Sequence, residues 1–228
     1  MDGYLLVDKP VGISSFGVVA KVKKLIRDQT GQKVKIGHTG TLDPLASGLM
    51  ILVLGSYTKR ASEFSKMDKT YEVELTLGYS SKTGDAEGPI SRVSDKQPSK
   101  DQIKDVLNQF IGRIKQTPHA HSAIKVGGQR AYKLARAGKE FKIEPRHVTI
   151  YSIDSVEYEY PKLRFITDVS SGTYIRSLAE DIGQKLGTGA YMSALRRTEV
   201  GKFNLIKATT LVEIKSINLY NIVEHANR

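Results

Sequence analysis

The chain has 228 residues, no cysteine and a formal net charge of +11, because 35 lysines and arginines face 24 aspartates and glutamates. This length suits one large domain or two small ones, and 39% hydrophobic residues can build a core, which excludes disorder as the main state. The absence of cysteine excludes disulfides, zinc ribbons, iron–sulfur clusters and thiol nucleophiles. No apolar run approaches the roughly 18 residues of a membrane span, and no signal peptide is evident, so we expect a soluble, cytoplasmic protein.

In the first quarter of the chain, the pattern predicts a strand at Tyr4–Val7 and a helix capped by Ser14 or Ser15. One face of that helix is apolar and consists of Val18, Val19, Val22, Leu25 and Ile26. The segment Gly31–Gly48 is rich in glycine, threonine and aspartate, which is typical of a loop. The apolar run Leu49–Leu54 predicts a buried strand.

The next elements follow from alternation and helical spacing. Polar and apolar residues alternate around Tyr71, which predicts a half-buried strand with Tyr71 on its inward face. Gly84–Pro98 is polar and rich in turn residues. Ser99 then caps an amphipathic helix whose apolar stripe is Ile103, Val106, Leu107, Phe110 and Ile111.

Residues 119–147 are basic and contain glycine, and their only helical pattern is short, at Ala131–Ala137, so they predict a mobile surface insertion. Two strands follow at Val148–Tyr158 and Leu163–Val169, and then a helix that ends at Gly187. Strands and helices mix without a βαβ rhythm. This predicts an α+β fold with a mixed, largely antiparallel sheet flanked by helices, in a single domain spanning residues 1–228.

The positive charge is clustered, and a sequence pI near 9.6 suits a surface that binds a polyanion such as nucleic acid. The simpler interpretation of each cluster is a solvated face. The clusters are Lys21, Lys23, Lys24 and Arg27; then Lys125, Arg130, Lys133, Arg136 and Lys139; then Arg196, Arg197 and Lys202.

The most informative segment is Gly37–Gly48, which reads GHTGTLDPLASG. A loop of this composition, directly before a buried strand, would hold the carboxylate of Asp43 at a fixed position on the rim of the core. From residue statistics alone, Asp43 would instead cap a turn before Pro44. The segment lacks the GxxxxGK[ST] pattern of a P-loop and the paired carboxylates of a hydrolase.

Several ordered motifs between about Tyr4 and Phe203 resemble the TruB family of tRNA pseudouridine synthases. They are LLVDKPVGISSF, GHTGTLDPLASGLMIL, KTYEVELTLG, SAIKVGGQRAYKLARAG and SSGTYIRSLAEDIG. The resemblance implies the pseudouridine-synthase fold and an isomerase that converts a flipped-out uridine in the TΨC arm of tRNA to pseudouridine, without metal or organic cofactor. We expect a monomer that binds the TΨC stem–loop and needs neither a membrane nor an obligatory protein partner.

The resemblance implies that Asp43 is the catalytic carboxylate, Arg176 its counter-ion and Tyr71 the residue that stacks on the uracil. The carboxylate could attack the sugar C1′, assist elimination to a glycal or attack C6 of the base, and the sequence does not choose among these. Without the resemblance, Arg176 would form a surface pair with Glu180, and Tyr71 would simply pack in the core.

The resemblance also implies a set of substrate-binding residues. His38 would fill or guard the vacated base site, Leu195 would line the uracil pocket, and Lys9, Lys59 and Asp85 match charged positions near it. The alternatives are a turn histidine, an ordinary core leucine and lysines that serve solubility. In the insertion, we expect contacts to tRNA phosphates from Lys125, Arg130, Lys133 and Arg136.

Two features depart from the family pattern. Many relatives have Pro-Pro-x-Tyr-Ser-Ala before the insertion, whereas this chain has Pro118-His119-Ala120-His121-Ser122-Ala123, which puts a stacking contact there in doubt. His119 and His121 have no third ligand in an evident motif, so no metal site is predicted. The C-terminal PUA domain of many relatives is expected to be absent or truncated.

Two rival functions remain open at this stage. The first is a module that binds and folds tRNA without essential catalysis, for which the basic surface would suffice. The second is an unrelated DNA-binding protein, which is disfavoured because the sequence has no helix-turn-helix, zinc-finger or heptad signature.

Overall fold

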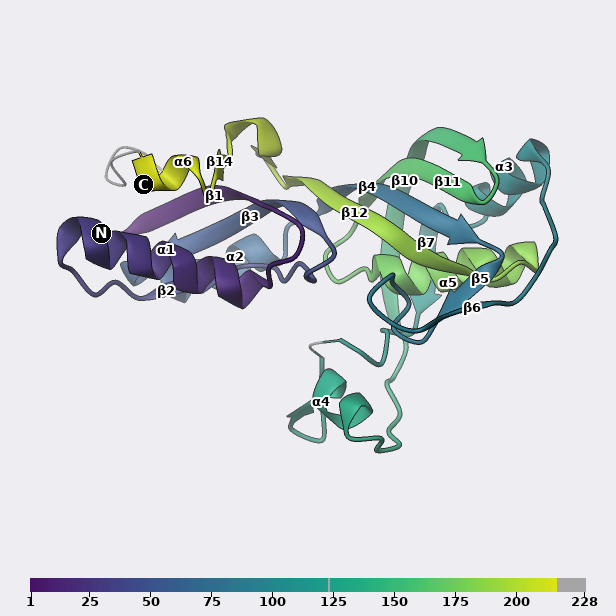
Figure 1. Cartoon of the computed structure of the whole chain (residues 1–228), viewed down its shortest axis with the longest axis horizontal. Coiled ribbons are helices and arrows are strands. Elements are labelled where there is room, and N and C mark those ends of the chain that lie inside the picture. Colours follow the sequence, from purple (N-terminus) through teal and green to yellow (C-terminus); the bar gives the residue numbers. More distant parts are fainter. Residues whose placement is uncertain (123, 217–228) are drawn as a thin grey trace. The chain divides into compact units, whose positions relative to one another are not determined.

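The computed structural model describes residues 1–122 and 124–216, and its contacts group the chain into two compact units (Figure 1). Unit 1 contains Met1–Tyr71 and the chain from Leu195 onward, and unit 2 contains Glu72–Ala194. Strands β4 (Lys69–Leu77) and β12 (Ala190–Val200) carry the chain from one unit to the other. That the two units act as one catalytic domain stays a prediction.

The sheet of unit 1 is built around β3, which forms from the apolar run seen in the sequence. Strand β1 pairs with β3 in antiparallel register, from Gly3 opposite Leu54 to Lys9 opposite Gly48. The other partners of β3 are β2 and the second half of β12, and β14 and β13 lie beside β1 and β12. The strands of unit 1 are β1 (Gly3–Lys9), β2 (Ile36–His38), β3 (Ser47–Leu54), β13 (Phe203–Asn204) and β14 (Thr209–Thr210).

Helix α1 (Ser15–Thr30) begins and ends where its sequence indicates, and it runs along β1 and β3 in Figure 1. The hydroxyl of Ser14 accepts a hydrogen bond from the backbone N–H of Gly17, and Gly31 ends the helix in the left-handed conformation. The predicted apolar stripe is buried except for Leu25, which is half-buried. The short helices of unit 1 are η1 (Gly55–Arg60), α2 (Ala61–Ser65), η2 (Leu205–Lys207) and α6 (Glu213–Ser216).

The core of unit 1 is aromatic and aliphatic. The rings of Tyr4 and Phe203 meet edge to face at 5.2 Å, and Phe64 packs against both. The cluster also buries Leu49, Ile51 and Val53 of β3, together with Leu6 of β1 and Val200 of β12. Burial of such side chains supplies about 1.5–3 kcal/mol each, so this cluster is a main source of stability for unit 1.

In unit 2, the sheet continues from β12 through β4, β11, β10 and β7. Strands β10 and β11 form the predicted antiparallel hairpin, and β7 pairs antiparallel with the other edge of β10. The larger elements are β7 (Gly112–Gln116), β10 (Arg146–Glu159), β11 (Lys162–Val169), α3 (Lys100–Asn108) and α5 (Ile175–Leu186). The shorter ones are β5 (Tyr79–Ser81), β6 (Ile90–Arg92), β8 (Lys125–Val126), β9 (Gln129–Arg130) and α4 (Ala131–Arg136).

The α+β prediction with a largely antiparallel sheet is confirmed, and the local details differ in several places. Strands β7 and β12 lie where no element was predicted. The loop predicted at Gly31–Gly48 contains β2, and the turn-rich segment Gly84–Pro98 contains β6. Helix α3 has the predicted Ser99 cap but ends before Phe110 and Ile111. Thr76 belongs to the polar residues of the alternation around Tyr71, yet it is buried, and its hydroxyl accepts a hydrogen bond from the ammonium of Lys162 at 3.0 Å.

Candidate active site

Asp43 lies in the segment that joins β2 to β3, which we call the Asp43 loop (residues 39–46). Its backbone carbonyl accepts a hydrogen bond from the N–H of Ala46 at 3.0 Å and closes a turn over Pro44 and Leu45. Asp43 itself is half-buried. The turn predicted from residue statistics is therefore present, and it is made by the backbone of Asp43.

Lys9 supports the Asp43 loop from below the surface. Its side chain is fully buried, and its ammonium donates to the backbone carbonyls of Pro10 at 2.9 Å, Ile13 at 2.7 Å and Pro44 at 3.4 Å. A buried ammonium needs such partners because it has lost its water. The alternative that Lys9 is a surface residue for solubility is wrong.

Ser15 and Arg197 hold the rest of the Asp43 loop. The hydroxyl of Ser15 donates to the carbonyl of Leu42 and accepts from its N–H, both at 2.8 Å. Arg197, which is 2% exposed, donates to the carbonyls of Leu49 at 2.7 Å and Gly40 at 3.1 Å. Lys9, Ser15 and Arg197 thus form a buried clamp around the loop.

The sequence analysis missed Arg197 as a support, because it placed this residue in a basic cluster that could be a solvated face. A signal was available, since neighbouring residues on a strand point to opposite faces. On β12, Arg196 is half-buried and pairs with Asp8 at 2.8 Å, while Arg197 points inward. The close fit extends to Gly48, whose φ is +100° and where an added Cβ would overlap the backbone carbonyl of Arg197.

His38 stands at the end of β2, opposite Leu52 of β3. Its Nδ1 atom is buried and has no hydrogen-bond partner among the described residues. Burial lowers the pKa of His38, and the positive charge of Arg197 lowers it further. The lowered pKa favours the neutral imidazole, whose Nδ1 could still form a hydrogen bond.

The other unit 1 residues differ in exposure. Tyr71 is 7% exposed on β4, which confirms its predicted inward face. Leu195 is half-buried on β12, so it is not a fully buried core leucine. Lys59 is exposed in η1, where the solubility interpretation and the RNA-binding interpretation both remain possible.

Arg176 lies in the first turn of α5 and is buried, with 6% of its surface exposed. Its Nη1 donates to the carbonyl of Thr83 at 3.0 Å and to Oδ2 of Asp85 at 3.3 Å, and its Nη2 donates to the carbonyl of His121 at 2.9 Å. The predicted alternative, a surface pair between Arg176 and Glu180, is wrong.

Asp85 is the acidic partner of Arg176 in unit 2, and it is 2% exposed. Its Oδ1 accepts from the hydroxyl of Thr83 at 2.6 Å and from the N–H of Glu87 at 3.1 Å, while Oδ2 faces the guanidinium. With both oxygens bonded, the carboxylate is fixed in one orientation. Asp85 therefore holds the guanidinium of Arg176 in place, a contact that the sequence did not reveal.

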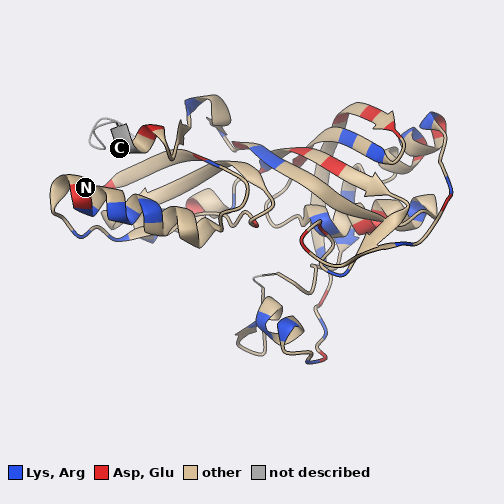
Figure 2. Cartoon of the chain, viewed as in Figure 1, with Lys and Arg blue, Asp and Glu red and all other residues tan. Residues whose placement is uncertain are grey.

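The four cations predicted in the insertion are all exposed: Lys125, Arg130, Lys133 and Arg136. Lys125 pairs with Arg130 across the two-stranded β8–β9 ribbon, and Arg136 lies over the ring of Tyr132 at 5.7 Å. Figure 2 shows basic residues on α4 and on α1. Within residues 1–122 and 124–216, no group of three histidines or carboxylates could hold a metal ion, and no helix is long and apolar enough to cross a membrane.

Comparison with protein families identifies the chain. Residues 25–175 match the N-terminal domain of the TruB family pseudouridylate synthases, and residues 176–226 match the C-terminal domain of tRNA pseudouridylate synthase B. The chain belongs to the TruB family of pseudouridylate synthases, and its enzyme class is that of the isomerases.

Its relatives carry a more particular name. The tRNA pseudouridine synthase B of Dechloromonas aromatica (strain RCB) is 44% identical over 96% of this chain and 71% of its own length. The protein of the same name from Aquifex aeolicus (strain VF5) is 42% identical over 95% of this chain and 74% of its own length.

Solved structures share the fold. The chain is similar to one in a Cbf5-Nop10-Gar1 complex, with a TM-score of 0.72 and 32% identity over 94% of this chain. It is also similar to one in an H/ACA RNP bound to a substrate RNA containing 2′-deoxyuridine, with a TM-score of 0.68 and 28% identity. This chain spans about half the length of those two chains, 54% of the first and 56% of the second. The predicted pseudouridine-synthase fold is confirmed.

Proposed function

We propose that this enzyme isomerises a uridine in the TΨC arm of tRNA to pseudouridine and that the carboxylate of Asp43 carries the reaction. The observation that supports this role is the buried clamp of Lys9, Ser15 and Arg197, which fixes the backbone on both sides of Asp43. A single carboxylate that must meet one atom of a substrate needs such a rigid frame.

The reaction balances within one nucleotide. The N1–C1′ bond breaks, the uracil turns, a C5–C1′ bond forms, and the proton lost from C5 is matched by one gained at N1. No co-reactant is required. Asp43 would act as a nucleophile at C1′, assist elimination to a glycal or attack C6, and the three routes remain open.

Arg176 is proposed as the cation that keeps Asp43 ionised, with Asp85 holding the guanidinium in place. A guanidinium that already donates to Thr83, Asp85 and His121 has few orientations left, which suits it to this task. Tyr71 would stack on the flipped uracil. Leu195 would line the uracil pocket, and His38 would fill or guard the vacated base site. The cytoplasm, where tRNA is present, is the proposed location.

Affinity for tRNA is assigned to the exposed cations of the insertion, because phosphate contacts need accessible positive charge. A protein that reads only this arm should modify an isolated TΨC stem–loop nearly as well as whole tRNA. We propose that the enzyme acts as a monomer without an obligatory protein partner.

The decisive variant is Asp43→Asn, because a neutral amide is neither an anionic nucleophile nor a base. Pseudouridine formation on an unmodified tRNA transcript, mapped by chemical adduct and primer extension, should fall at least about a thousandfold. Affinity for tRNA should change little.

Asp105→Asn is the matched control, since Asp105 is exposed on α3. Substantial turnover by Asp43→Asn would remove this residue from catalysis. A wild-type enzyme that binds tRNA but leaves its uridines unchanged would favour the rival, a module that folds tRNA.

A further inference from the structure

A series of polar contacts leads from the side chain of Glu180 on α5 to the buried guanidinium of Arg176. Oε1 of Glu180 lies 3.3 Å from Nε2 of His119, and Nδ1 of His119 accepts from the backbone N–H of His121 at 3.1 Å. The carbonyl of His121 in turn accepts from Nη2 of Arg176 at 2.9 Å. The two histidine rings are stacked, with centroids 5.7 Å apart.

The partners of His119 define its tautomer. Since Nδ1 accepts a hydrogen bond from a backbone N–H, the proton of the neutral ring lies on Nε2, where it points at the carboxylate of Glu180. Both ring nitrogens are thus in use, and the side chain is only 9% exposed. The turn at Gly84 packs closely on this pair, because a Cβ added there would lie 3.1 Å from both Glu180 Oε1 and the His119 ring.

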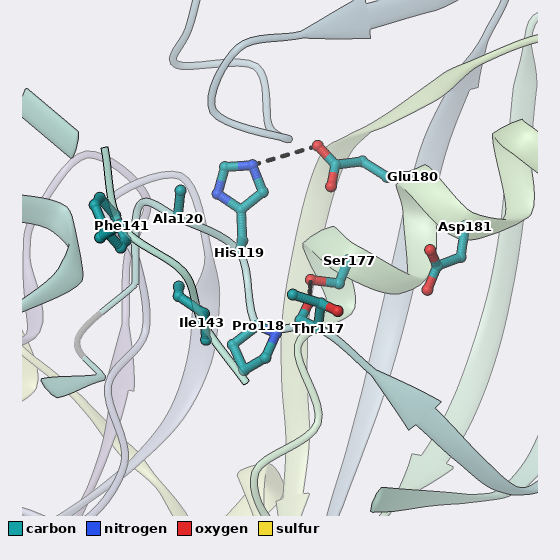
Figure 3. Close-up of a pocket in the computed structure, with 9 residues that line it drawn as sticks. All are labelled: Thr117, Pro118, His119, Ala120, Phe141, Ile143, Ser177, Glu180 and Asp181. Carbon is teal, nitrogen blue, oxygen red and sulfur yellow. Dashed lines mark hydrogen bonds and ion pairs between the residues drawn. The ribbon is translucent and has the colours of Figure 1, made fainter. Parts of the chain in front are cut away.

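These residues lie at the base of the insertion. Figure 3 shows His119 and Glu180 facing each other at the edge of a cavity of about 310 Å³. Thr117 and Pro118 line it from the start of the insertion, Phe141 and Ile143 from its end, and α5 supplies the remaining wall. The start is tied to α5, since the Ser177 hydroxyl donates to the Thr117 carbonyl at 2.8 Å.

We propose that His119, held by Glu180, is a positioning residue for Arg176. Its imidazole fixes the backbone at residues 119–121, and so fixes the carbonyl that receives one arm of the guanidinium. Without the ring, that carbonyl can turn away, and Arg176 loses the hydrogen bond that orients its Nη2 arm, while its bonds to Thr83 and Asp85 stay. This inference rests on the proposed role of Arg176 in catalysis.

Single-turnover rates with saturating tRNA test the inference. His119→Ala should lower the rate about five- to tenfold, with tRNA affinity unchanged, because one hydrogen bond that orients the guanidinium is lost. His119→Asn should recover most of that loss, since its Oδ1 takes the place of Nδ1 as acceptor from the N–H of His121. His147→Ala is the matched control, because His147 is exposed on β10.

A double variant asks whether His119 acts through Arg176. In an Arg176→Lys background, adding His119→Ala should cost clearly less than in the wild type, because no guanidinium remains to be oriented. An equal loss in both backgrounds would overturn the inference, as would a wild-type rate for His119→Ala. If His119→Ala does not fold, Glu180→Ala carries the same comparison, because it removes the carboxylate that holds the His119 ring.

The outcomes separate this inference from the proposed function. A wild-type enzyme that forms no pseudouridine overturns the proposed function, and the inference falls with it. An active wild-type enzyme whose rate is indifferent to His119 overturns the inference alone.

Discussion

The Asp43 loop and the insertion are held in opposite ways. The loop is anchored by side chains far away in the sequence, since Ser15 bonds Leu42 across 27 positions and Arg197 bonds Gly40 across 157. Beyond its base at His119 and His121, the insertion depends on close neighbours, such as the N–H of Ala131 donating to the carbonyl of Ile124 at 2.8 Å. The anchors of the loop are buried, while the charged groups of the insertion are exposed.

This difference matches the proposed work of each region. A carboxylate that must reach one atom loses rate when it moves by an ångström, so its support is rigid and non-local. Cations that neutralise phosphates act over a longer range and need water-accessible side chains more than a fixed geometry. Stability and RNA affinity should therefore be separable by mutation.

The largest expected effect is on the clamp. Arg197→Ala removes the guanidinium that donates to the carbonyls of Leu49 and Gly40, at about 1–3 kcal/mol each. Thermal unfolding should therefore shift down by at least ~4–8 °C. Arg196→Ala, which removes a half-exposed pair with Asp8, should cost less than about 1 kcal/mol. Equal shifts for the two arginines would refute the clamp.

A smaller effect is expected in the insertion and should appear only in binding. The double variant Arg130→Ala, Lys133→Ala should weaken tRNA affinity most at low salt and flatten the plot of log affinity against log salt by about 0.7–0.9 units for each lost contact. The melting temperature should stay unchanged. Lys100→Ala, Lys104→Ala on α3 removes the same charge from another exposed surface. An unaltered slope would show that the insertion is not the phosphate-binding element.

The smallest effect concerns Lys69, which lies near the clamp. Its ammonium donates to the carbonyls of Ser65 and Met67, and burial, with the nearby charge of Arg197, lowers its pKa from 10.5 to about 8 despite the opposing effect of Asp68. Between these values the unfolded chain binds more protons than the folded one, so folding gains stability as pH rises from about 8 to 10.5.

Urea unfolding at several pH values can measure this gain against Lys69→Met, which lacks the titrating group. Wild-type stability relative to the variant should rise over that interval. Adding Arg197→Ala to both proteins should reduce the rise, because one of the charges that lower the pKa is gone. A difference independent of pH would mean that Lys69 titrates normally.

Local signals in the sequence predicted much of the fold. The Ser14 and Ser99 caps, the apolar run of β3 and the hairpin of β10 and β11 each depend on residues close together in the chain, and each was found. Strands β2 and β6 were missed because three residues are too few to show alternation.

The sequence predicted which residues belong to the site better than it predicted how they are arranged. The family motifs drew attention to Asp43 and Arg176, and their assigned roles stay predictions. Lys9 and the Arg176–Asp85 pair are buried because the fold brings distant partners close to them; Asp85, for example, is 91 positions from Arg176. The composition of the sequence does not indicate such contacts. The contact between His119 and Glu180 was likewise not predicted from the sequence.

The clamp also has a consequence for the order of events during synthesis. Unit 2 is one continuous stretch of chain, whereas unit 1 combines an early segment with a late one. Arg197 is made 148 residues after Leu49, so the Asp43 loop waits for its last support until nearly the whole of unit 2 has left the ribosome. A nascent chain therefore carries Asp43 long before it can hold that carboxylate in place.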